Sequence, residues 1–128
     1  MALSITRSVT QSTTTAGTFQ ALSALGAATV SSSFTVPTNV SSIKNITVSF
    51  STDAIEEYVG LCKITGNAMR DGDAVFNCGG QSGVTSGTNM MYVNIDTDLA
   101  VQPGNTISYE ICTTSAATID CAVTCQFA

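Results

Sequence analysis

Carboxylates are the first residues of this chain whose type and spacing could do chemistry. They form three short acidic clusters: Asp53 with Glu56 and Glu57, Asp71 with Asp73, and Asp96 with Asp98. Carboxylate oxygens are ligands that Ca²⁺ accepts, but none of the clusters has the ligand spacing of an EF-hand loop. Aspartate is also common in turns, because its side chain hydrogen-bonds the nearby backbone. We therefore expect solvated turns and no cofactor. The candidate ligands for the one alternative, a Ca²⁺ site, are Asp71, Asp73, Asp96 and Asp98.

The residue types and motifs that common enzyme sites need are not in the sequence. The chain has no His, so the Ser-His-Asp and Cys-His arrangements that activate a nucleophile cannot be built. The glycine-rich stretch GGQSGVTSGT, residues 79–88, contains no Lys and is therefore not a phosphate-binding P-loop. Paired carboxylates can hydrolyse glycosides, but we expect such a site to lie in a groove lined with aromatic side chains. Because the chain has no Trp and only three Tyr, we expect no enzymatic activity.

The chain has five cysteines, an odd number, so at least one thiol is unpaired or pairs between chains. In the stretch TIDCAVTCQF, Cys121 and Cys125 fall on the same face of an expected strand. Four residues along a strand span roughly 13 Å, whereas a disulfide needs Cα atoms within about 7 Å. The two residues therefore cannot bridge each other. Either both are buried thiols, or one or both pair with the remaining cysteines, which are Cys62, Cys78 and Cys112.

The composition describes a surface with few charges. The chain has 128 residues, which suits one domain with its own hydrophobic core. Charged residues make up 10% of it, against about 25% in typical domains. The polar surface must be mostly hydroxyl and amide, because the chain has 20 Thr and 15 Ser. Soluble monomers usually keep apart by surface charge, so we expect neighbouring subunits to cover much of this surface.

The charge pattern excludes two classes of partner. The net charge is −5, and the four basic residues are scattered along the chain: Arg7, Lys44, Lys63 and Arg70. Nucleic-acid binding needs a basic patch, and so does electrostatic binding to a membrane surface. No apolar run reaches the length of a transmembrane helix. We therefore expect neither nucleic acid nor membrane insertion.

Alternating apolar and polar residues predict an all-β fold. Runs with strand-like patterns lie at residues 3–11, 32–37, 43–50, 57–65, 74–78, 89–95, 106–112 and 118–127. Turn residues separate these runs, and Pro103-Gly104 suits the centre of a type II turn. No convincing amphipathic helix is present, although residues 19–28 could form a short one. Short strands at this spacing indicate an antiparallel β-sandwich or jelly-roll barrel of about eight strands.

The N-terminal segment has two interpretations. Residues 1–18 form either an extended arm or a first strand followed by a loop, and residues 19–128 form the sandwich domain. In the arm interpretation, the segment adds a strand to the sheet edge of a neighbour. The residues that would contact the neighbour alternate with hydroxyl residues: Leu3, Ile5, Arg7 and Val9.

Three stretches resemble a known family. SFTVPTNVSSIKNITVSF (residues 33–50) carries a Val-Pro corner before a strand, LAVQPGNTISYEI (residues 99–111) carries a Pro-Gly-Asn corner before another, and CAVTCQFA ends the chain in a strand. Over roughly residues 32–128 this arrangement resembles the small single jelly-roll capsid proteins of icosahedral viruses, in particular the vertical single-β-barrel lineage of membrane-containing archaeal and bacterial viruses.

The resemblance implies a major or minor capsid subunit in a virion. Its partners would be copies of itself in a symmetric shell, together with other capsid proteins. The shell would form by burial of strand edges and uncharged Ser/Thr faces between subunits, where few charges keep the desolvation cost low. Disulfides of the cysteines would lock the shell within or between subunits.

Two other classes of protein share the composition. One is a secreted or cell-surface filament or surface-layer subunit, in which strand donation builds open fibres instead of closed shells. The other is a Ca²⁺- or carbohydrate-binding β-sandwich module. Particles of one size would indicate a shell protein, rods of varying length would indicate a filament subunit, and a small species stabilised by ligand would indicate a binding module.

Overall fold

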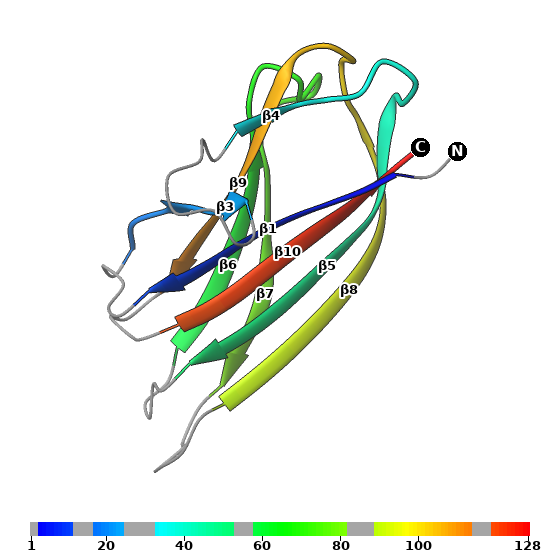
Figure 1. Cartoon of the computed structure of the whole chain (residues 1–128). Helices are drawn as coiled ribbons and strands as arrows, with labels where there is room; N and C mark the ends of the chain where they lie inside the picture. Colours follow the sequence, from blue (N-terminus) through cyan, green and yellow to red (C-terminus); the bar gives the residue numbers. More distant parts are fainter. Residues whose placement is uncertain (1–2, 12–16, 25–32, 53–57, 82–88, 114–118) are drawn as a thin grey trace.

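The chain folds into a sandwich of two antiparallel β-sheets (Figure 1). The computed structural model describes residues 3–11, 17–24, 33–52, 58–81, 89–113 and 119–128. Its strands are β1 (Leu3–Gln11), β2 (Gln20–Ala21), β3 (Ser23–Ala24), β4 (Ser33–Thr35), β5 (Ser42–Thr52), β6 (Tyr58–Thr65), β7 (Ala74–Gln81), β8 (Asn89–Ala100), β9 (Thr106–Thr113) and β10 (Ile119–Phe127). The all-β prediction is thus confirmed. No helix of the described part is long and apolar enough to cross a membrane.

The strand order identifies the sandwich as a jelly roll. Sheet A has the order β3-β1-β10-β5-β8, and sheet B has the order β2-β9-β6-β7. Both β2 and β4 pair with β9, at successive positions along it, so they act as one interrupted edge strand. Each sheet then has four principal strands, and the chain crosses between the sheets after β1, β4, β5, β7, β8 and β9, with the short β3 of sheet A lying between β2 and β4 in the chain. This connectivity agrees with the predicted jelly roll of about eight strands.

The N-terminal segment is a strand of the sandwich in this structure. Strand β1 pairs with β10 along its whole length, from Leu3 opposite Phe127 to Gln11 opposite Ile119. Gly17 is also held against the sandwich, because its N–H donates to the Thr113 carbonyl at 2.9 Å. In the structure this segment is therefore the first strand of the sandwich and not an extended arm. It covers an edge of β10 that would otherwise be exposed. Donation of this segment to a neighbour stays a prediction.

Two sequence predictions for short segments are wrong, and tertiary pairing explains both. Residues 20–21 and 23–24 are strands and not a helix, because neighbouring strands hold them extended. Residues 20–21 pair with β9, where the Leu22 N–H donates to the Tyr109 carbonyl at 3.0 Å, and residues 23–24 pair with β1. Asp96 and Asp98 lie within β8 and not in a turn. Their neighbours Ile95 and Leu99 continue the inward phase of the strand, so the two carboxylates point outward.

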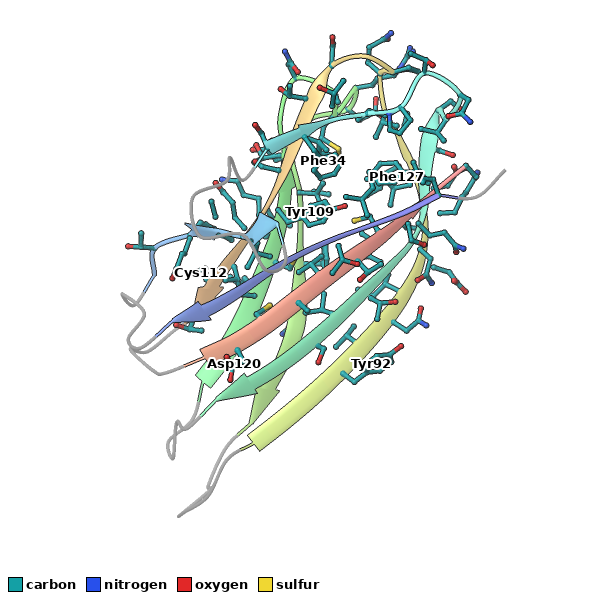
Figure 2. All side chains as sticks on the ribbon, in the orientation of Figure 1. Phe34, Tyr92, Tyr109, Cys112, Asp120 and Phe127 are labelled. Atoms are coloured by element: carbon teal, nitrogen blue, oxygen red, sulfur yellow. The ribbon has the colours of Figure 1, made fainter. Side chains whose placement is uncertain are left out.

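An aromatic cluster joins the two sheets at one end of the core (Figure 2). Phe34 meets the ring of Tyr109 edge-on, at 5.3 Å between ring centroids, and it meets Phe127 in the same way at 6.1 Å. Tyr109 is fully buried in sheet B, and its hydroxyl donates to the carbonyl of Ile5 in sheet A at 3.1 Å. Aromatic packing and one directed hydrogen bond thus fix the distance between the sheets at this end.

The predicted corners are present. Gly104 has φ of +85°, as a type II turn requires at its third position, and the Asn105 N–H donates to the Gln102 carbonyl at 3.3 Å. Gly72 has φ of +90° in the corner between Asp71 and Asp73. Glycine adopts these left-handed conformations without the Cβ strain that other residues suffer.

Candidate interaction surfaces

The acidic residues do not meet in one place. Thr65 donates its hydroxyl to Asp73 at 2.6 Å, and Lys44 pairs with Asp98 at 2.7 Å. Asp96 accepts a hydrogen bond from the Asn45 side chain at 2.9 Å. Among the described residues, no group of three or more metal-ligating acids, Cys or His gathers. The corner at Asp71 and the acids of β8 therefore do not form a shared Ca²⁺ cage. The cluster of Asp53, Glu56 and Glu57 lies outside the described residues.

Four of the five cysteines are buried and form no disulfide among the described residues. They are Cys62, Cys112, Cys121 and Cys125, and the side chain of Cys78 lies outside the described part of the chain. The prediction that Cys121 and Cys125 share an inward face is confirmed, since both are buried in the core. No disulfide within the described part of the chain joins these four, because the strands place them as separate packing residues. Disulfides between subunits stay a prediction. Their thiols fill space between apolar side chains.

Burial makes the thiol of Cys125 chemically inert. Desolvation raises its pKa to about 12, although a side-chain hydrogen bond with Tyr109 acts in the opposite direction. The thiolate is the reactive form of cysteine, and a raised pKa removes it at neutral pH. Burial therefore keeps the Cys125 side chain in its protonated thiol form at neutral pH.

The outer face of sheet A carries hydroxyl and amide side chains. The strand register places one row straight across four strands: Thr6, Thr124, Thr47 and Asn94. Within this row the hydroxyls of Thr6 and Thr124 lie 2.8 Å apart and share a hydrogen bond. The abundant Ser and Thr of the sequence thus form the solvent side of this sheet, as the alternation predicts.

Strand β8 adds an aromatic ring and fixed polar groups to this face. Tyr92 lies on β8 with 66% of its surface exposed (Figure 2). The amide nitrogen of Asn45 donates to Asn94 Oδ1 at 2.5 Å and to Asp96 Oδ1 at 2.9 Å, and its oxygen accepts from Thr47 at 3.1 Å. The side chains next to Tyr92 along β8 are therefore held in defined orientations.

The outer face of sheet B has a different character. Its central row, in strand order, is Val75, Lys63, Glu110 and Ala21. Lys63 and Glu110 form an ion pair at 3.5 Å, and only 26% and 24% of these two side chains are exposed. The Lys63 ammonium also lies 4.8 Å from the centroid of the Phe19 ring. Val75 is 53% exposed beside this neutralised pair. We call this row, together with Phe19, the sheet B face.

Two edge strands of the sandwich, β7 and β8, are interrupted. In β8 the register with β5 shifts between Ile43 and Asn45, which leaves a bulge near the acidic side chains of Asp96 and Asp98. In β7 the register shifts so that Cys78 has no partner opposite it. Bulges and edge charges oppose the addition of a further strand to a sheet. Continuous strand pairing with another chain at these edges is thus disfavoured.

Sequence reasoning missed both Tyr92 and the sheet B face. In the stretch NMMYVNID, Tyr92 alternates with inward residues and shares the outward side with Asn94 and Asp96. The period of two therefore reveals an aromatic residue among polar ones on the exposed side of the strand. The sheet B face has no comparable signal, because Val75, Lys63 and Glu110 come from three separate strands. Only the register brings them together.

Comparisons with known proteins give a fold but no family. No family model matches the chain, and no curated protein matches it. Solved structures do: a chain of infectious bursal disease virus, Gx strain, has a TM-score of 0.55 at 16% identity, with 98% of this chain and 32% of that chain covered. This chain therefore spans about a third of the length of that viral chain.

Two further solved structures of the same fold are a complement domain and a virus vertex protein. The globular domain of zebrafish complement 1qA has a TM-score of 0.54 at 16% identity, with 98% of this chain and 94% of that chain covered. The vertex protein P5 of PRD1 has a TM-score of 0.54 at 12% identity, with coverage of 95% and 71%. At these identities the similarity extends to the fold alone. The chain has the jelly-roll sandwich that viral capsid proteins and a complement domain share.

Proposed function

We propose that this chain is a structural subunit of a virion, which assembles with copies of itself into the shell or its vertices. Three lines support this role. The topology is a jelly roll, the similar structures include two proteins of virus particles, and the surface has few charges to desolvate. The specific viral lineage suggested by the corners of the sequence is part of the proposal.

The sheet B face is the observation that carries the proposal. A charge is costly to bury unless it is already paired, and Lys63 and Glu110 are paired and mostly covered within one subunit. Val75 offers exposed apolar surface directly beside them. A neighbour can therefore cover this face with a gain from apolar burial and little loss of ionic hydration.

The interrupted edges of β7 and β8 oppose the growth of a filament through these two strands. A fibre built by strand donation needs a long, regular edge with free backbone groups. The bulges on both strands oppose this, and the acidic side chains on β8 add to the effect. Contact through a face leaves the edges unused, which agrees with the protection they carry.

A pair of charge substitutions tests the proposal. Val75→Glu places a carboxylate opposite Lys63, where an opposite charge across the strands is tolerated by the fold. Its matched control is Gln126→Glu on the outer face of sheet A, which is also exposed. We expect light scattering to show that Val75→Glu dissociates the assembly while Gln126→Glu leaves it intact, with both variants keeping the wild-type circular dichroism spectrum. Equal assembly of both variants would refute the role of the sheet B face.

A secreted or cell-surface binding module is the second candidate. The observation in its favour is the similarity to a complement globular domain that almost matches this chain in length. A module of this kind would remain a monomer or a small ring at all concentrations. The scattering measurement on the wild-type chain separates the two functions.

A further inference from the structure

The exposed side of β8 combines an aromatic ring with oriented polar groups. Tyr92 is the most exposed of the large apolar side chains in the described residues. Asn94 and Asp96 follow it on the same face of the strand. We propose that these three residues bind a neutral carbohydrate, with the Tyr92 ring stacked on a sugar ring and the other two side chains bonded to its hydroxyls. This site does not depend on the proposed shell function.

The polar half of the site is preorganised. Asn45 uses both of its amide hydrogens, one on Asn94 Oδ1 and one on Asp96 Oδ1, and its own oxygen accepts from Thr47. These bonds leave the Asn94 amide hydrogens as donors and the second Asp96 oxygen as an acceptor. A sugar hydroxyl both donates and accepts, so it matches this pair of groups. Binding then costs little side-chain entropy, because the groups are already ordered.

The apolar half of the site is the face of Tyr92. The register places it opposite Ser49, and the next residue in that row is Ala122. Neighbours this small leave the ring accessible from the solvent side. One face of a pyranose ring presents C–H groups that pack against an aromatic ring. Residues two apart on a strand are separated by roughly 6.6 Å and residues four apart by roughly 13 Å. A short chain of linked sugars can therefore reach from Tyr92 to Asp96.

The charges of this face select a neutral ligand over two other occupants. Among the described side chains, the outer face of sheet A carries three carboxylates, Asp96, Asp98 and Asp120, and one cation, Lys44. The cation is already paired with Asp98. The same face of a second copy would bring like charges together, which is repulsive. A sialylated glycan or another anion meets the same repulsion. A neutral polyhydroxylated chain does not.

The position of the site also keeps it free in an assembly. Tyr92 lies on the outer face of sheet A, and Val75 lies on the outer face of sheet B. The two surfaces are on opposite sides of the sandwich (Figure 1). A neighbour on the sheet B face therefore does not cover the proposed carbohydrate site.

Saturation-transfer NMR with neutral hexasaccharides of glucose, mannose and N-acetylglucosamine tests the proposal. We expect transfer from the wild-type chain to the C–H protons of at least one hexasaccharide. Tyr92→Phe keeps the ring and is expected to bind within about twofold of wild type. Tyr92→Ala removes the stacking, and a loss of about tenfold in affinity is expected. Asn45→Ala, which releases Asn94 and Asp96, should weaken binding while transfer to the sugar face on Tyr92 persists.

Three outcomes would overturn the proposal. One is the absence of transfer to any of the three neutral hexasaccharides. Another is equal transfer from Tyr92→Ala and wild type, which would place binding elsewhere on the chain. The third is a change in particle size by Tyr92→Ala without an effect on sugar binding, which would make Tyr92 a subunit contact. A sialylated hexasaccharide is the control ligand and should show no transfer. Because Tyr92 is exposed, its substitution should leave the melting temperature unchanged.

Discussion

Gly66 lies where the chain after β6 passes closest to the start of β9. A Cβ atom added there would meet the Thr106 carbonyl oxygen at 2.4 Å and Ile107 Cα at 2.8 Å. Both atoms are backbone, and Thr106 O is held because it accepts a hydrogen bond from the Ala68 N–H at 3.0 Å. Gly66 also has φ of +132°, which side chains rarely adopt. Gly66→Ala must therefore move the β9 backbone or break this contact.

The size of the effect follows from two terms. The left-handed conformation costs about 1–2 kcal/mol, and overpacking against backbone adds about 1–3 kcal/mol. The free energy of unfolding should fall by about 2–5 kcal/mol. At about 2.1 cal/mol/K per residue, a chain of 128 residues loses about 4 °C of melting temperature per kcal/mol. Gly66→Ala should therefore lower the melting temperature by about 8–18 °C.

Gly104→Ala is the matched control. Gly104 has φ of +85° but nothing within 4 Å of an added Cβ. Gly104→Ala should therefore lose only the free energy of the left-handed conformation, without any overpacking. We expect it to lower the melting temperature by about 4–7 °C. Thermal unfolding followed by circular dichroism measures both variants. If Gly66→Ala proved no less stable than Gly104→Ala, the close approach of this loop to β9 would be wrong, and with it the placement of β9 in sheet B.

Two further predictions concern the core. Tyr109→Phe removes the hydroxyl that donates to the Ile5 carbonyl and contacts Cys125, and urea unfolding should show a loss of about 1–3 kcal/mol; an unchanged midpoint would mean that the hydroxyl does not link the sheets. The pKa of Cys125 is raised to about 12 from its ordinary 9.0, so its contribution to stability is complete below pH 9 and is lost as pH rises toward 12. Above pH 9 the unfolding free energy should fall by about 1.4 kcal/mol per pH unit from this group. Cys125→Ala should flatten that slope, and an identical slope in the variant would contradict the burial of the thiol.

The sequence pattern predicted those parts of the fold that depend on strand period. The alternation in residues 43–50 and 106–112 predicted β5 and β9 because inward and outward residues repeat every second position. Residues 20–24 were predicted less well, since pairing with β9 and β1, and not local propensity, holds them extended. Asp96 and Asp98 suggested a turn by residue type, but the phase of their apolar neighbours places them in β8.

The candidate surfaces were harder to predict than the fold. A single strand shows which residues point outward, so the exposed position of Tyr92 follows from its phase. Contacts between strands far apart in the chain depend on register, which local pattern does not determine. The pairing of Lys63 with Glu110 is of this kind. The cysteines illustrate the same limit: their strand phase predicted burial, whereas their mutual distances needed the folded chain.

The most direct test of the proposed function is the assembly state of the purified chain, observed by negative-stain electron microscopy and light scattering on one sample. We predict closed particles of uniform size, which Val75→Glu dissociates. Rods of varying length would contradict the account, because they would indicate an open filament instead of a closed shell. A monomer at every concentration would also contradict it and would favour the binding module.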